Sequence, residues 1–203
     1  YFIIRFINKY RAKYIYFTNF IKKIIMKKIF LLPILFVFVF GCSIPNMVVV
    51  ELESKSSTNV NGNVVFTEMN QVVTMIAEIK NLQPGEHAIH LHEKSDCSSD
   101  DGKSTGGHWN PTLTSHGKWG DDNGFHIGDI GNFVADENGT GNITFSTDLW
   151  CLNCDDENKN IIGKAIIVHQ GIDDFTSQPS GAAGSRITCG GIISDNAILN
   201  SEK

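Results

Sequence analysis

The first 50 residues contain no aspartate or glutamate, and no histidine occurs before position 87 or after position 169. Only five prolines are present, and no segment shows sustained helical periodicity with capping residues. With 41% hydrophobic and 19% charged residues among 203, the composition excludes wholesale disorder and collagen-like repetition. The length suits one ordinary domain with appendages.

The acidic charge is confined to the body of the chain. From Cys42 onward, 22 acidic residues stand against nine Lys and Arg, a net charge of −13, while eight of the 17 basic residues precede position 30. An acidic body repels phosphate backbones, so no nucleic-acid partner is expected.

A basic stretch and a short apolar run precede Cys42. Two lysines follow Met26, the apolar run covers residues 29–40, and Gly41 stands before the cysteine. The run is too short for a bilayer of about 30 Å. This pattern is typical of a bacterial lipoprotein signal peptide with lipid on Cys42. Plain secretion and a permanent membrane anchor are the alternatives.

The chain therefore divides into five parts. Residues 1–25 begin with Tyr and are expected to be upstream, non-native translation. A signal peptide over 26–41, a lipid-anchored tether over 42–47, a domain over 48–195 and a C-terminal tail over 196–203 follow. Export would place the domain on the periplasmic side of the cell envelope, attached to the membrane only through lipid, where disulfides can form.

The body predicts short strands joined by long loops. Asn138-Gly139 is a hairpin-turn signal, and residues 94–124 have almost no strand character. An all-β, eight-stranded Greek-key barrel or sandwich is therefore expected. The strand candidates are Met47 to Glu53, Val60 to Glu68, Val72 to Ile79, His87 to Glu93, Phe125 to Val134, Gly141 to Leu149, Ile161 to His169 and Ile187 to Ile193.

Histidines recur at spacings suited to metal binding. His90 and His92 are two apart, so on a strand both rings project from one face. A solvated polar pair would explain them if they stood alone. Five further candidate ligands follow in the chain: His108, His116, His126, Asp129 and His169.

Several motifs surround these residues in order: His90-Leu91-His92-Glu93, Gly107-His108-Trp109-Asn110-Pro111, His126-Ile127-Gly128-Asp129-Ile130-Gly131-Asn132, Val168-His169, and Ala183-Gly184-Ser185-Arg186-Ile187-Thr188-Cys189-Gly190. From about Val48 to Ile193 the chain resembles copper,zinc superoxide dismutases. The resemblance implies that the long loops bind metal and guide the substrate.

The resemblance also implies two ligand sets that share His108. The copper group would be His90, His92, His108 and His169, and the zinc group His108, His116, His126 and Asp129. Imidazoles with an open position suit redox copper, and three imidazoles with a carboxylate suit zinc.

Two residues near these sets receive supporting roles. Asp173 would accept hydrogen bonds from His90 and His116, with Asp174 as the alternative. His87 is expected to be structural, hydrogen-bonding a loop.

The activity implied is conversion of superoxide to dioxygen and hydrogen peroxide by Cu(II)/Cu(I) cycling, which would protect the cell envelope. His108 would bridge the metals as an imidazolate and supply a proton. Arg186 would guide the anion, with Lys94, Lys103 and Lys118 as candidates to assist. Competing hypotheses are a non-catalytic copper or zinc binding or delivery module and a structural β-sandwich. A homodimer and a monomer both remain open.

Four cysteines remain if Cys42 carries lipid, and spacing alone does not decide among their three pairings. The resemblance implies a disulfide between Cys97 and Cys189. For Cys151 and Cys154, a local disulfide, an accessory metal-capture site and free thiols stay open.

Overall fold

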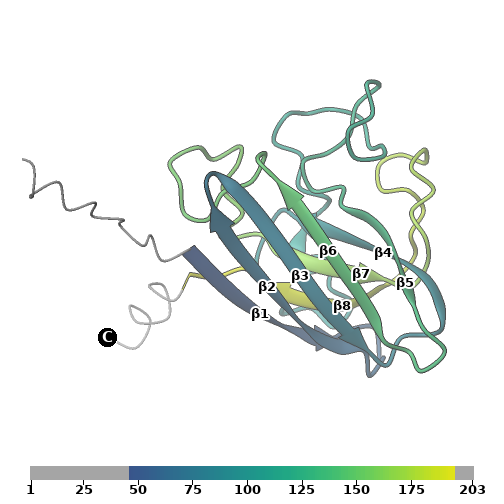
Figure 1. Ribbon diagram of the computed structural model, residues 1–203. Coiled ribbons are helices and arrows are strands. Elements are labelled where there is room, and N and C mark those ends of the chain that lie inside the picture. The colour runs from purple at the N-terminus through teal and green to yellow at the C-terminus, as the bar shows by residue number, and fades with distance from the viewer. Residues whose placement is uncertain (1–45, 195–203) are drawn as a thin grey trace, which may run out of the picture. The chain divides into compact units, whose positions relative to one another are not determined.

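The computed structural model describes residues 46–194, which form a closed antiparallel barrel of eight strands (Figure 1). The strands are β1 (Asn46–Ser54), β2 (Asn61–Met69), β3 (Val72–Lys80), β4 (Gly85–His92), β5 (Gly131–Ala135), β6 (Gly141–Thr147), β7 (Ala165–His169) and β8 (Arg186–Gly191). Their order around the barrel is β1-β2-β3-β6-β5-β4-β7-β8, and β8 closes onto β1. The predicted eight-stranded all-β barrel is confirmed.

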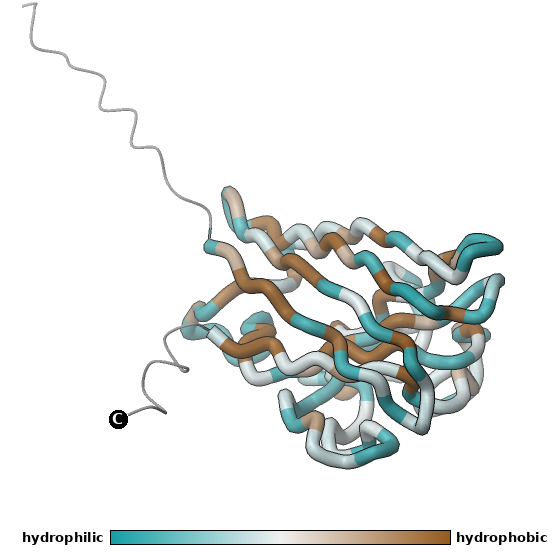
Figure 2. The backbone as a smooth tube through the Cα atoms, turned by 90° about the horizontal axis from the view of Figure 1, so that it is seen from below, coloured by the Kyte–Doolittle hydropathy of each residue, from teal (hydrophilic) through white to brown (hydrophobic). Residues whose placement is uncertain are grey.

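Buried and exposed side chains alternate along the strands, and the buried ones form the core of the barrel. Val48, Val50 and Leu52 of β1 are buried, and the residues between them are exposed. Brown and teal accordingly alternate along the strands in Figure 2. Because successive strand residues face opposite sides, each strand contributes one apolar face to the barrel interior.

β4 and β7 depart from this alternation because both of their faces are covered. His87 to His92 and all five residues of β7 are buried. Ile89 and Leu91 of β4 belong to the barrel core. The intervening His90 and His92 face the other side, so this is the surface where polar ligands can be buried.

The largest differences between predicted and observed strands are at the beginnings of β5 and β7. Residues 125–130 form a turn in which Asp129 N donates to His126 O and Ile130 N to Gly128 O. Residues 161–164 also turn, with Lys164 N donating to Ile161 O. Apolar residues at these positions pack against the core, but they lie in loops. A pattern of buried side chains alone does not distinguish such a loop from a hydrogen-bonded strand.

The predicted long loop is present and carries the 3-10 turn η1 (Lys103–Thr105). Cys97 and Cys189 form a disulfide that ties this loop to β8, and Cys151 and Cys154 form a local disulfide. The free-thiol and metal-capture hypotheses for the second pair are therefore not supported.

The first strand extends two residues before residue 48, where the domain was predicted to begin. β1 begins at Asn46, because Asn46 and Met47 pair with Glu68 and Thr67 of β2. The predictions for residues 1–45, including Cys42, and for the tail lie outside the described residues. Among residues 46–194, no helix is long and apolar enough to cross a membrane.

Candidate metal centre

The seven predicted ligands come from two strands and one long loop. His90 and His92 lie on β4, and His169 ends β7 beside it. The other four, His108, His116, His126 and Asp129, lie in the loop between β4 and β5.

A short backbone ladder fixes the loop beside β4. His108 forms a bridge with His92, Trp109 N donates to Leu91 O, and Leu91 N donates to Gly128 O. A Cβ on Gly128 would lie 2.5 Å from Leu91 O, so only glycine allows this approach. The ladder therefore sets the loop ligands against the strand ligands.

The ligand atoms gather into two buried groups. The copper group and the zinc group each have ligand atoms within 4.8 Å of one another, and His108 belongs to both. The ring centroids of His90 and His108 are 4.0 Å apart, and those of His108 and His116 are 5.4 Å apart. The two groups thus form one continuous centre.

The copper group leaves one buried nitrogen on each ring without a hydrogen-bond partner. These atoms are His90 Nδ1 and Nε2 of His92, His108 and His169. Unpaired buried polar atoms are costly, so four converging on one point indicate a metal ion. The rings fit copper as the sequence predicts.

Three rings of the copper group, those of His90, His92 and His169, do not belong to the zinc group. In each of them the second ring nitrogen has a hydrogen-bond partner in the protein. His92 Nδ1 lies 3.0 Å from Gly106 O, and His169 Nδ1 lies 3.3 Å from Gly184 O. His90 Nε2 lies 2.9 Å from Asp173 Oδ2. Because these acceptors require N–H on that side, each free nitrogen keeps its lone pair for the metal.

In the zinc group, Asp129 stands against three imidazoles. Its carboxylate oxygens lie 2.8 Å from His108 Nδ1, 2.9 Å from His116 Nδ1 and 3.2 Å from His126 Nδ1. The His116 and His126 atoms nevertheless lack hydrogen-bond geometry. Ligand separations of roughly 3.3 Å follow from tetrahedral bonds to zinc of about 2.0 Å. The group is therefore shaped for zinc.

Burial favours the neutral form of three rings of the copper group, His92, His108 and His169. It lowers the pKa of His92 and of His169 well below the ordinary imidazole value, and neighbouring rings lower it further. Burial also lowers the pKa of His108, to about 4, against the opposing effect of Asp129. Neutral rings at pH 7 are the form that binds metal.

The carboxylates act in the opposite direction. Burial disfavours ionisation of Asp129 and Asp173, but neighbouring imidazoles hold the pKa of each carboxyl below its usual range. His108 is the main partner of Asp129, and His116 and His90 are the partners of Asp173. Burial would lower the pKa of His116, yet Asp129 and Asp173 outweigh it and raise this pKa to about 9. Both carboxylates are thus ionised at pH 7 and favour bound cations.

The carboxylate of Asp173 contacts one ring of the copper group and one ring of the zinc group. Its Oδ2 lies 2.9 Å from His90 Nε2 and its Oδ1 lies 2.8 Å from His116 Nε2. The neighbouring Asp174 is exposed and instead accepts hydrogen bonds from Thr176 and Ser177. The structure therefore favours Asp173 over the alternative.

Asp173→Asn is expected to weaken binding of both metals by about 10 to 100-fold, because an amide can accept a bond from only one of the two rings. Competition titrations of copper and zinc measure the effect. Asp174→Asn, which makes the same chemical change at an exposed position, is the control. Unchanged affinities in Asp173→Asn would show that the carboxylate does not support the ligands.

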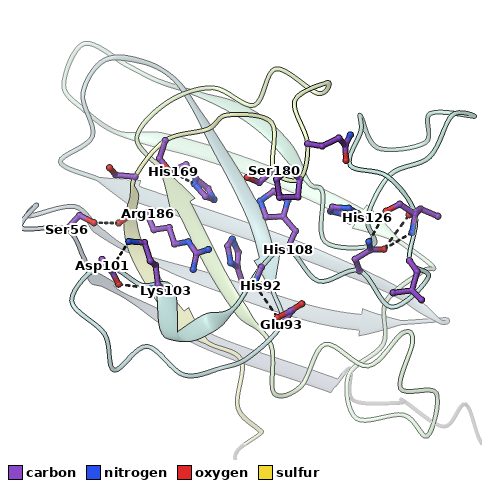
Figure 3. Close-up of a pocket in the computed structure, with 18 residues that line it drawn as sticks. Ser56, His92, Glu93, Asp101, Lys103, His108, His126, His169, Ser180 and Arg186 are labelled. Carbon is purple, nitrogen blue, oxygen red and sulfur yellow. Dashed lines mark hydrogen bonds and ion pairs between the residues drawn. The ribbon is translucent and has the colours of Figure 1, made fainter.

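An open cleft of about 630 Å³ leads to the copper group. Figure 3 shows Arg186, His92, His108 and His169 around this cleft. Arg186 Nη1 donates to Gly102 O at 2.9 Å and to Thr105 Oγ1 at 3.1 Å. The guanidinium is therefore held beside the copper group.

The three candidate lysines are not equivalent. Lys103 lines the cleft, but its ammonium lies 2.8 Å from the carboxylate of Asp101. Lys94 and Lys118 are exposed and are not among the residues that line the cleft. Arg186 thus supplies the cationic group nearest the copper ligands among the residues that line this cleft.

His87 belongs to neither group. Its ring is buried, with Nδ1 3.0 Å from His169 O and Nε2 2.8 Å from Gln83 O. The structural role expected for His87 agrees with these contacts, which hold the backbone of a copper ligand.

Sequence reasoning missed several supporting residues. The Thr105 hydroxyl lies 3.3 Å from His92 Nδ1 and bonds Arg186, so it connects a ligand to the cleft cation. Gln178 exchanges two hydrogen bonds with the backbone of His116. A Cβ on Gly181 would overlap the Asp173 carboxylate. No local signal marks these positions, since each partner is distant in sequence.

An all-β barrel with two buried ligand groups joined by one imidazole defines a binuclear metalloprotein. The family described as copper/zinc superoxide dismutase (SODC) matches residues 60–192. The chain therefore belongs to the copper/zinc superoxide dismutase family, and it carries complete copper-binding and zinc-binding residue sets.

Curated relatives agree with this assignment. The extracellular superoxide dismutase [Cu-Zn] of Caenorhabditis elegans is 34% identical over 144 residues, 68% of this chain and 63% of that protein. The Drosophila melanogaster protein of the same name is 35% identical over 143 residues, 66% of this chain and 76% of that protein. The chain thus spans less than two thirds of the nematode protein.

Solved structures agree as well. A double mutant of a SOD-like protein from Bacillus subtilis is 30% identical with a TM-score of 0.65, covering 72% of this chain and 97% of the other. The clock protein EA4 is 34% identical with a TM-score of 0.63, covering 75% of this chain and 98% of the other.

Proposed function

We propose that this protein converts two superoxide anions and two protons into dioxygen and hydrogen peroxide. The observation that carries the proposal is His108, whose Nε2 faces the copper group and whose Nδ1 faces Asp129 of the zinc group. A single imidazole shared by both groups beside an open cleft suits a redox centre with its own proton donor.

The proposed mechanism assigns one role to each side of the His108 ring. Copper held by His90, His92, His108 and His169 would supply the one-electron redox chemistry of the reaction, and zinc held by the zinc group would tune the acidity of His108. His108 Nε2 would serve in turn as a copper ligand and as the carrier of one proton, which it delivers to the peroxide product, and solvent water would supply the second proton. Its Nδ1 stays with the zinc group, so the ring keeps its position through the cycle.

The direct test compares superoxide consumption by the protein loaded with copper and zinc and by the protein loaded with zinc alone. Rapid turnover that requires copper is expected. Stoichiometric binding of both metals without turnover would refute the enzyme and favour a copper or zinc delivery module on the same fold.

Arg186 is proposed to attract superoxide into the cleft. The body carries a charge of −13, so attraction must be local. Arg186→Ala is expected to lower kcat/KM by about tenfold and to flatten its dependence on ionic strength, because the fixed cation beside the copper group is lost. Turnover measured across a salt series tests this.

Lys118→Ala is the matched control, since it removes the same charge from an exposed position outside the cleft. It should leave the salt profile nearly unchanged. Identical profiles for the two variants would refute local steering by Arg186.

The proposed location is the periplasmic side of the cell envelope, with lipid on Cys42 and 42–47 as a tether, as the 26–41 segment supports. The extracellular relatives and the two disulfides are consistent with export. Cys42→Ala is expected to abolish incorporation of labelled palmitate and release the protein from membranes. Labelling that persists would refute lipidation at Cys42.

A homodimer stays a prediction, which analytical ultracentrifugation of the purified protein can test.

A further inference from the structure

A cluster of aromatic rings lies between the zinc-group loop, residues 109–130, and the barrel. The Trp119 ring centroid is 4.8 Å from that of Phe145, 4.9 Å from that of Phe125 and 5.9 Å from that of Trp150. Trp150 in turn lies 5.1 Å from Phe145 of β6 and 6.4 Å from Phe66 of β2. The cluster therefore joins the loop to two strands.

The ring orientations favour one arrangement of this cluster. Trp119 meets Phe145 at 87° and Trp150 at 81°, both edge to face. This geometry places a positive ring edge on a negative ring face, so it is more specific than apolar contact alone. Trp119 is accordingly held in position as well as partly buried.

The cluster contacts the loop between two of the zinc ligands, His116 and His126. Trp119 follows His116 by three residues, and Phe125 directly precedes His126. Residues 120–123 between them are exposed. Loop segments with few buried apolar contacts open at low cost, so without Trp119 this segment would be poorly fixed.

Trp150 adds a polar contact to the same loop. Its indole Nε1 donates to Ile127 O at 2.8 Å, and both residues are buried. Ile127 stands between the ligands His126 and Asp129 in the turn already described. The hydrogen bond therefore fixes the turn that presents two zinc ligands.

We infer that Trp119 and Trp150 are positioning residues that pre-form the zinc site by clamping its loop to the barrel. A pre-formed site binds more tightly because the metal need not order the loop. The inference rests on the zinc site of the proposed function and adds two residues that do not contact the metal.

The test measures zinc affinity of the metal-free protein by competition with a chelator. Trp119→Ala is expected to weaken zinc binding by about tenfold or more, the usual cost of losing a residue that supports a ligand. Leu113→Ala changes an 89% exposed residue of the same loop and should have no effect. Trp119→Phe, which keeps a ring, should recover much of the affinity.

Two further measurements separate positioning from general stability. Cobalt(II) replaces zinc as a probe, and its visible absorption should change in Trp119→Ala because the ligand geometry is relaxed. Trp150→Phe keeps an aromatic ring at this buried position but removes the Ile127 hydrogen bond together with part of the indole, so it tests the clamp even where Trp119→Ala does not fold. Zinc affinity and cobalt spectra unchanged in Trp150→Phe, and in Trp119→Ala where that variant folds, would overturn the inference. Failure of the wild-type protein to bind zinc would instead refute the proposed function.

Discussion

His169→Ala is expected to lower copper-dependent superoxide turnover by more than about a hundredfold, beyond the usual cost of losing a residue that only supports a ligand. His169 supplies one of the four unpaired nitrogens of the copper group and lines the cleft. Its loss leaves three imidazoles, so the remaining ligands hold the ion more weakly and with a different geometry.

The same variant should affect copper binding without affecting zinc binding. His169 is not a member of the zinc group, and it lies on β7 rather than on the loop that carries the zinc ligands. Zinc affinity should therefore remain within about twofold of the wild-type value, whereas copper affinity and turnover both fall. Full turnover in His169→Ala would exclude this residue from the copper site, and a parallel loss of zinc would indicate general disruption.

Strand residues explain why so much of the fold could be predicted. In β1 and β3, buried and exposed residues alternate, as Val73, Met75, Ala77 and Ile79 of β3 show, so sequence alone locates the strand and its inner face. At residues 125–130 the apolar side chains pack from a turn, and alternation gives the wrong extent. The alternation of apolar residues indicates which side chains are buried. Only the backbone hydrogen bonds show whether those residues form a strand or a turn.

In the candidate site, the metal ligands could be predicted from the sequence, whereas the residues that support them could not. The resemblance to copper,zinc superoxide dismutases implies the seven metal-binding positions, and their residue types suit copper and zinc. Thr105 and Trp150 carry no such signal, since a threonine in a polar loop and a tryptophan after a strand have many roles. Their functions depend on partners 81 and 23 residues away, Arg186 and Ile127. Long-range contacts of this kind require the three-dimensional structure.

Removing the disulfide between Cys97 and Cys189, by changing both residues to serine, is expected to lower the free energy of unfolding by about 4 to 5 kcal/mol. The bond closes a separation of 92 residues, and a cross-link of this length restricts the unfolded chain strongly. Denaturant titration measures the loss. Removing the bond between Cys151 and Cys154 in the same way provides the matched control, because a separation of three residues should cost only about 2 kcal/mol.

The longer disulfide should also affect catalysis, because it holds the loop that supports Arg186. Gly102 and Thr105, which accept the guanidinium hydrogen bonds, lie in the loop that Cys97 anchors, and Cys189 lies three residues beyond Arg186 on β8. Without the bond, the loop is expected to loosen and kcat/KM to fall with a weaker salt dependence, as in Arg186→Ala. The control variant should keep the wild-type salt profile. A wild-type salt profile in the variant that lacks the Cys97–Cys189 bond would mean that this disulfide does not position the arginine, and that its two hydrogen bonds suffice.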